Sequence, residues 1–219
     1  MTITPESVKE LLDSEDFALR IRGLNQLRQI EPDIAFNLLK PTIEDQNTRV
    51  RYAAVSQLDT LGKSDIQASL AILRDRLFND PEPDVQAAAA DAIGGLKLVE
   101  AFDDLSKSFH ETPEWLVQFS IIAALGELGD PRGFDLLQEA LASDNNLLQT
   151  AAIGSMGELG DSRAIPLLAE FVDHEDWQIR YRLVQALGRL GGEQAQAIIT
   201  KLTNDESEQV AQEAKNNLN

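Results

Sequence analysis

The chain has 219 residues, of which 37 are acidic and 19 basic, giving a net charge of −18 at pH 7 and no cysteine. The lack of cysteine excludes disulfides, thiolate nucleophiles, zinc fingers and a ligand attached through a protein sulfur. The acidic charge repels phosphate backbones, so we expect no nucleic-acid partner. No apolar segment has the length of a membrane span or the layout of a signal peptide, so we expect a cytoplasmic protein without membrane insertion.

One apolar pattern recurs seven times along the chain. Its anchor residues are Leu19, Val50, Val85, Val117, Leu148, Ile179 and Val210, with successive separations of 31, 35, 32, 31, 31 and 31. A fixed period in the thirties is typical of units that bury their apolar faces only by stacking on copies of themselves. We therefore count positions from the anchor of each copy, so that +1 is the residue after it.

Each copy is predicted to be a pair of helices. Positions +4, +7, +8 and +11 are apolar in the clearest copies, which is the spacing of one helical stripe. Gly129 and Gly160 then end their helices, and Asp130-Pro131 is expected to supply the N-cap and first turn of the next helix. The first helix is expected to begin at Thr4-Pro5-Glu6, and the last is polar on its outer side, as a terminal cap requires.

Seven pairs give fourteen helices and no strand. The sequence therefore predicts an all-α fold, a right-handed α-solenoid of about seven short helix-pair repeats, forming a single domain over residues 1–219.

A groove is predicted on the second helices of the pairs. Positions +2, +5, +6 and +9 point away from the core stripe, yet they are mostly small, apolar or aromatic. The candidate groove residues are Arg20, Arg51, Tyr52, Phe119, Ile122, Gly126, Ile153, Gly157, Arg180, Tyr181, Arg182 and Gly188. Two alternatives stay open: position +5 can pack against the neighbouring repeat, and the glycines at +9 can serve close helix packing.

Arginines and aromatic residues recur at fixed positions. Arg20, Arg51 and Arg180 share position +1, where a guanidinium can bind a ligand carboxylate or brace an adjacent repeat through its acidic residues. Phe17, Trp115 and Trp177 share position −2 and are predicted to act as hydrophobic staples rather than to stack on a ligand.

No motif of a known enzyme class is present. The only histidines, His110 and His174, are expected in turns, and the acidic turns lack the ligand spacing of a calcium loop, so no metal site is predicted. Weak candidates for proton transfer are Asp59, Asp91, His110 and His174.

Three segments carry a family resemblance. They read ALGELGDPR, GELGDSRAIPLL and EDWQIRYRLVQALGRLG, and they resemble the short HEAT-type repeat of the phycobilin lyase family (E/F type), most strongly in residues 113–192. The opening TPESVKELLDSEDFALRIRGLNQLRQIEP and the seven-copy layout resemble the cyanobacterial members that serve phycobilisome degradation. The resemblance implies a cytoplasmic protein that binds phycobiliproteins, phycocyanin or allophycocyanin, and detaches the cysteine-linked bilin as a carbon–sulfur lyase.

The resemblance also implies a ligand, an open-chain tetrapyrrole such as phycocyanobilin, and no tightly bound cofactor. Its propionates would require arginines, its pyrrole N–H groups carboxylates, and its faces aromatic rings. The candidates are Arg20, Arg51, Arg180 and Arg182 for the propionates, Asp59 and Asp91 for the N–H groups, and Tyr52, Phe119 and Tyr181 for the rings.

Two other functions stay open. The chain can be one subunit of a two-chain phycobilin lyase, with a second HEAT-type subunit docked on its more acidic C-terminal half. Residues 111–219 hold 7 basic and 18 acidic residues, net −11, against 12 and 19, net −7, in residues 1–110. It can also be a non-catalytic adaptor that presents phycobiliproteins to a protease.

Overall fold

The computed structural model describes residues 3–218, and all regular structure in this range is helical. The described range contains fifteen α-helices and five short 3₁₀ segments. The all-α prediction is therefore confirmed. There is one α-helix more than the fourteen expected because the second helix of the second copy is interrupted at Gln57.

Residue contacts divide the chain into two compact units, Met1–Ile121 and Ile122–Asn219. The division falls inside helix α9 (Trp115–Leu128). Each unit is described here by itself.

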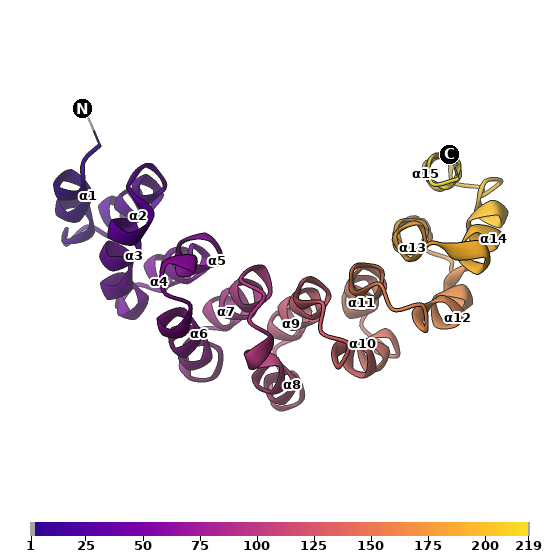
Figure 1. Ribbon diagram of the computed structural model, residues 1–219, viewed down its shortest axis with the longest axis horizontal. Helices are drawn as coiled ribbons and strands as arrows, with labels where there is room; N and C mark the ends of the chain where they lie inside the picture. The colour runs from indigo at the N-terminus through magenta and orange to yellow at the C-terminus, as the bar shows by residue number, and fades with distance from the viewer. Residues whose placement is uncertain (1–2, 219) are drawn as a thin grey trace. The chain divides into compact units, whose positions relative to one another are not determined.

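The first unit contains the pairs of the first four copies. Its helices are α1 (Pro5–Leu12), α2 (Phe17–Gln26), α3 (Pro32–Leu39), α4 (Thr48–Ser56), α5 (Leu58–Leu61), α6 (Ile66–Asn79), α7 (Pro83–Gly95), α8 (Phe102–Glu111) and the first half of α9. Short 3₁₀ segments follow α2 and α3 (η1, Leu27–Gln29; η2, Lys40–Glu44) and precede α6 and α8 (η3, Gly62–Ser64; η4, Val99–Ala101). The second helices α2, α4 and α7 pack against one another in series (Figure 1).

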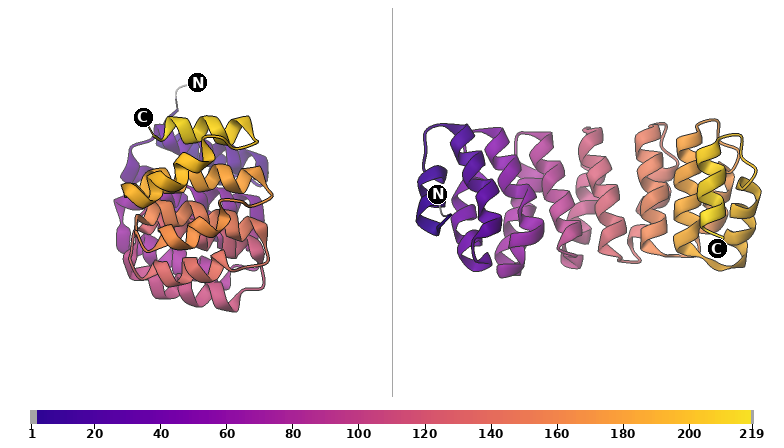
Figure 2. Two further views of the ribbon diagram at one scale, coloured as in Figure 1. Left: turned by 90° about the vertical axis from the view of Figure 1, so that its right-hand side faces the viewer. Right: turned by 90° about the horizontal axis from the view of Figure 1, so that it is seen from above.

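The second unit repeats the same arrangement. Its helices after α9 are α10 (Gly133–Leu141), α11 (Asn146–Leu159), α12 (Ala164–Leu168) with η5 (Ala169–Phe171), α13 (Trp177–Leu190), α14 (Gly192–Leu202) and α15 (Glu208–Asn216). Here α11 packs against α13, and α13 against α15. Within each unit the helices lie side by side, as the two further views show (Figure 2).

The predicted register is confirmed in six of the seven copies. The anchors from Val50 to Val210 are at most 5% exposed. The first anchor, Leu19, is 37% exposed, so the first copy departs from the other six in the burial of its anchor.

The helix ends follow the predicted turn chemistry with one exception. Gly129 (φ 69°) and Gly160 (φ 74°) adopt the left-handed conformation, and Thr4 caps the first helix. The prediction that Asp130 is an N-cap is wrong, because α10 starts only at Gly133. Asp130 instead accepts the backbone N–H of Arg132 at 2.9 Å and forms the turn that leads into the helix.

Candidate functional site

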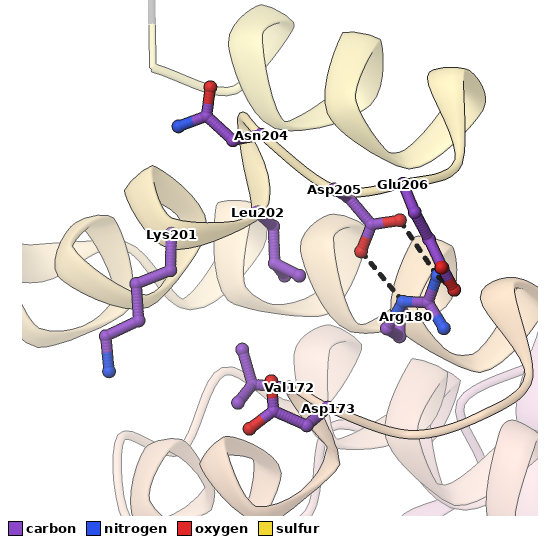
Figure 3. A pocket seen from close by; sticks show the side chains of 8 residues that line it. All are labelled: Val172, Asp173, Arg180, Lys201, Leu202, Asn204, Asp205 and Glu206. Atoms are coloured by element: carbon purple, nitrogen blue, oxygen red, sulfur yellow. Dashed lines mark hydrogen bonds and ion pairs between the residues drawn. The ribbon is translucent and has the colours of Figure 1, made fainter.

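The three arginines at position +1 form ion pairs between neighbouring repeats. Each reaches from a second helix to an aspartate in the turn before the second helix of the next copy. Nε and Nη2 of Arg51 donate to the two carboxylate oxygens of Asp80 at 2.9 and 3.0 Å, and those of Arg180 to Asp205 at 2.7 and 2.8 Å. Arg20 forms an ion pair with Asp45, to which only its Nη2 donates a hydrogen bond, at 2.9 Å. The Arg180–Asp205 pair forms part of the lining of a pocket of about 360 Å³ (Figure 3).

The same arginines also hold their own turn. Nη1 of Arg20, Arg51 and Arg180 donates to the carbonyl oxygen six residues earlier, at 2.8, 3.0 and 2.6 Å. Gln86 and Gln118, which occupy position +1 in the third and fourth copies, donate to the equivalent carbonyl. Of the two roles considered for these arginines, the structure shows the bracing of repeats. Arg51 and Arg180 are buried, so a ligand carboxylate would have to displace the aspartate.

The aspartate partners have a second task that sequence reasoning missed. Asp45, Asp80 and Asp205 all lie at position −5, where each accepts the backbone N–H two residues ahead at 2.8 to 3.0 Å. In copies that follow a glutamine at +1, position −5 is not acidic but still accepts the same N–H: the residues are Thr112, Ser143 and His174. This matching of charge from one copy to the next is visible in the sequence and predicts the clamps.

The clamp at Arg180 predicts a pH-dependent stability. The hydrogen bond from Arg180 lowers the pKa of Asp205 below its ordinary value. A carboxyl whose pKa is lower in the folded state stabilises the fold above its unfolded pKa of about 3.9, and that contribution is lost as the pH falls through the folded pKa. In denaturant melts from pH 7 to 3, we expect Arg180→Gln to be less stable than wild type at pH 7 and the difference to shrink below about pH 4.

The matched control is Arg182→Gln, two residues further along the same helix. Arg182 is exposed, and its one side-chain hydrogen bond within residues 3–218 goes to Gln185 on its own helix. It should change stability little at either end of the pH range. If the stability difference between Arg180→Gln and wild type stayed constant down to pH 3, the result would contradict the ion pair between Arg180 and Asp205.

The glycines at position +9 do not line a groove, which corrects the prediction. A Cβ built on Gly126 would lie 2.8 Å from Cα of Ser155, and one on Gly157 would lie 2.7 Å from Cα of Ala186. One on Gly188 would overlap the side chain of Asn217. In each case the contact is to position +7 of the next copy. The alternative of close helix packing is therefore the correct one, because a side chain here would collide with the next repeat.

Position +5 is also part of the core. Ile122 and Ile153 are fully buried, as are Val55 and Val184. Their inclusion in a ligand groove is wrong, because each second helix is covered by neighbouring repeats as well as by its own partner helix.

The remaining predicted groove residues reach solvent but are spread over the two units. Tyr52 is 48% exposed, and Phe119 and Tyr181 are half-buried. The hydroxyl of Tyr181 donates to Glu213 at 3.3 Å, and its ring meets Trp177 edge to face at 6.5 Å between centroids.

The four candidates for proton transfer come from four different segments of the first and second units. Asp59 is exposed and accepts a hydrogen bond from Thr60. Burial raises the pKa of Asp91, although its side chain still reaches solvent, and a hydrogen bond from Ser120 opposes the shift. His110 lies in the last turn of α8 and not in a turn between helices, whereas His174 lies in a turn, where its Nδ1 accepts the N–H of Asp176.

Aromatic residues at position −2 are unusually exposed. Phe17, Trp115 and Trp177 are 37%, 48% and 42% exposed, and each is the first residue of its helix. A hydrophobic staple precedes the N-cap, whereas Phe17 and Trp177 follow the caps Asp16 and Asp176, so the staple prediction is wrong for them. Each unit thus presents large apolar rings at the start of second helices.

A cavity of about 680 Å³ lies in the first unit, between the second helices of the first two copies. Its lining includes Arg28, Ile30, Tyr52, Gln57, Asp59 and Leu61. Two residues predicted from the sequence, Tyr52 and Asp59, are brought together here.

Within residues 3–218, no three histidine, aspartate or glutamate side chains are grouped so that they could hold a metal ion. In the same range, no helix has the length and apolar character needed to cross a membrane.

Comparison with known proteins identifies the family. HEAT repeats match residues 70–154 and 135–219, which together cover more than half of the chain. The chain belongs to the HEAT repeat proteins. No curated protein sequence gave a significant match.

Three solved structures are similar to this chain. The complex of CpcE and CpcF of phycocyanin lyase from Nostoc sp. PCC7120 aligns with a TM-score of 0.64 and 21% identity, covering 100% of this chain and 94% of that chain. An archaeal HEAT-like repeats protein from Thermococcus onnurineus NA1 aligns with a TM-score of 0.59 and 16% identity, covering 100% of this chain and 97% of that chain. An engineered protein aligns with a TM-score of 0.62 and 18% identity, covering 99% of this chain and 67% of that chain. At these identities the likeness is one of fold.

Proposed function

We propose that this chain is a cytoplasmic, phycobilin lyase-like HEAT protein that binds phycobiliproteins, phycocyanin or allophycocyanin, and assists detachment of their cysteine-linked bilin during phycobilisome degradation. The observation that carries it is the recurrence of exposed aromatic rings at position −2 in three copies. Large exposed aromatic residues mark protein-binding surfaces, because they supply the anchors of most interfaces. The alignment with a phycocyanin lyase chain and the LGDPR-type motifs favour a phycobiliprotein as the partner.

The reaction is a reverse addition. A base removes the proton from the carbon beside the thioether carbon, the C–S bond breaks with its electron pair on sulfur, and a double bond forms in the released pigment. A proton donor then neutralises the thiolate of the phycobiliprotein. Asp91 is a candidate for proton transfer, since a carboxyl with a raised pKa exchanges protons closer to neutral pH. The lack of cysteine in this chain is compatible with release, because no thiol of its own can recapture the pigment.

Incubation with a holo-phycobiliprotein tests the proposal. Absorbance of the protein-bound bilin should fall, free pigment should appear after filtration, and the apo-phycobiliprotein should gain one titratable thiol for each bilin lost. Trp115→Ser and Trp177→Ser should slow this release, because they remove exposed rings from separate units. The matched control is Ile34→Ser, which changes an exposed apolar residue on α3, the first helix of the second pair, and should leave the rate unchanged.

The likeness to the CpcE–CpcF complex favours one second candidate, a subunit of a two-chain lyase that attaches phycocyanobilin. In that case the chain alone would release no pigment, and a second HEAT-type subunit would be needed for attachment to an apo-phycobiliprotein. An adaptor for a protease would bind the holo-protein and leave its absorbance unchanged until the protease is added.

A further inference from the structure

The cavity of the first unit lies where the regular packing of the repeats is relaxed. Position +9 is glycine in the third to sixth copies, and in the second unit this glycine lets the next helix approach closely. The first two copies have Arg28 and Asp59 instead. Both side chains line the cavity. Residues at position +9 that are too large for close packing of neighbouring second helices therefore occur where the cavity lies.

A second irregularity coincides with the cavity. Position +7 is small in the third to sixth copies, but it is Gln26 in the first copy and Gln57 in the second. Helix α2 ends at Gln26, and α4 ends just before Gln57, whose N–H bonds back three residues to the carbonyl of Ala54 at 3.1 Å. Interruptions of this kind within a helix are frequent at functional sites.

Gln57 supplies the observation that points to a ligand. Its side chain is only 8% exposed and lines the cavity. Nε2 donates to the carbonyl of Ala53 at 3.3 Å, whereas no group of residues 3–218 donates to Oε1. A buried acceptor without a donor costs free energy, which a ligand N–H would recover.

The rest of the lining defines the chemistry of that ligand. Arg28 is exposed and has no ion pair or hydrogen bond to another described residue, so its guanidinium is available to a carboxylate. The half-exposed ring of Tyr52 offers an aromatic face, and Asp59 offers a second acceptor. The cavity therefore suits a flat conjugated molecule that carries both N–H donors and carboxylates, and its volume is in the range of small-molecule sites.

We infer that this cavity binds one end of an open-chain tetrapyrrole, a ligand class that rests on the function proposed above. Gln57 Oε1 accepts a ring N–H, Arg28 pairs with a propionate, and Tyr52 packs against the ring face. The site belongs to the first unit alone and uses neither the clamped arginines nor the glycines of the second unit.

Titration of the full chain with biliverdin tests the site. Binding should appear as a shifted absorbance band and an induced circular dichroism signal. Gln57→Leu removes the buried acceptor and Arg28→Met removes the cation, and each should weaken binding about 10-fold or more, the scale of a hydrogen bond to a buried or charged group. The matched control is Arg22→Met in α2, a helix that contributes to the cavity wall. Arg22 is exposed and does not line the cavity, so this variant should bind biliverdin like wild type.

A second probe isolates the role of Arg28. The dimethyl ester of biliverdin keeps the rings and N–H groups but lacks both carboxylates, so it should bind wild type more weakly than biliverdin does. Arg28→Met should bind the two probes equally, whereas Gln57→Leu should still prefer the acid. Far-ultraviolet dichroism and a melt of each variant confirm that it is folded, and the two substitutions lie on different helical segments, so one remains informative if the other fails.

Each outcome bears on the site separately from the function. No biliverdin binding by the wild-type chain, or wild-type affinity in both variants, would overturn the site even if the chain still released pigment from a phycobiliprotein. Affinity lost in both variants, with the ester pattern above, would establish the site even if no pigment were released, in which case only the proposed reaction would fail. Equal binding of the acid and the ester by wild type would refute the pairing with Arg28.

Discussion

Gly157→Leu should destabilise the protein by about 3 kcal/mol, because an added side chain at this position has no space. A Cβ there would lie 2.7 Å from Cα and 2.9 Å from Cβ of Ala186 on the next helix, and backbone cannot move aside as a flexible side chain can. The helices α11 and α13 would have to separate, which would expose part of the core between two repeats. Urea melts followed by circular dichroism measure the loss.

Gly154→Ala in the same helix is the matched control. Its Cβ would meet only the side chain of Arg182, at an ordinary distance of 3.5 Å. Since alanine favours a helix over glycine, this variant should gain about 0.5–1 kcal/mol. If Gly157→Leu melts like wild type, position +9 faces open space and the original groove prediction would be restored.

Arg51→Ala should have the second large effect, a loss of about 3–5 kcal/mol, because it leaves the carboxylate of Asp80 buried beside fewer donors. Asp80 is 2% exposed and receives two hydrogen bonds from Arg51. Arg51→Lys keeps the charge but not the paired geometry, and it should fall between wild type and the alanine variant.

The comparison is Arg132→Ala. Arg132 pairs with Asp130 within one exposed turn, so its removal should cost less than about 1 kcal/mol. Thermal melts of the three variants under one buffer condition rank them. Equal stability of Arg51→Ala and Arg132→Ala would show that the inter-repeat clamp contributes nothing.

The fold was predictable because the apolar pattern that produces each helix pair occurs seven times in the sequence. Anchors such as Val85 and Ile179 recur with helical stripes behind them, and chance does not reproduce such a spacing. The left-handed glycines Gly129 and Gly160 were predictable for the same reason, since a helix end has local chemistry. The exposed first anchor and the interruption at Gln57 depend on the neighbours of each copy, which a shared pattern does not contain.

The prediction of a groove was wrong because a helical wheel divides a helix into two faces, whereas a helix inside a stack has several neighbours. Ile122 lies opposite the core stripe and is still fully buried, and Gly157 lies there and faces Ala186 of the next repeat. The arginine clamps were predictable in principle, since Arg51 and Asp80 occupy positions +1 and −5 of successive copies. The cavity was only partly predictable, because its orphaned acceptor follows from the path of the helix around Gln57.

The clamps are distributed unevenly along the stack, and this affects how the chain unfolds. They join the first copy to the second, the second to the third, and the sixth to the seventh, through Arg20, Arg51 and Arg180. In a linear array each terminal repeat has one neighbour only and frays first when all couplings are equal. Since the clamps strengthen the couplings of the first and seventh copies, these two copies should exchange their amide hydrogens almost as slowly as the other copies of their own unit.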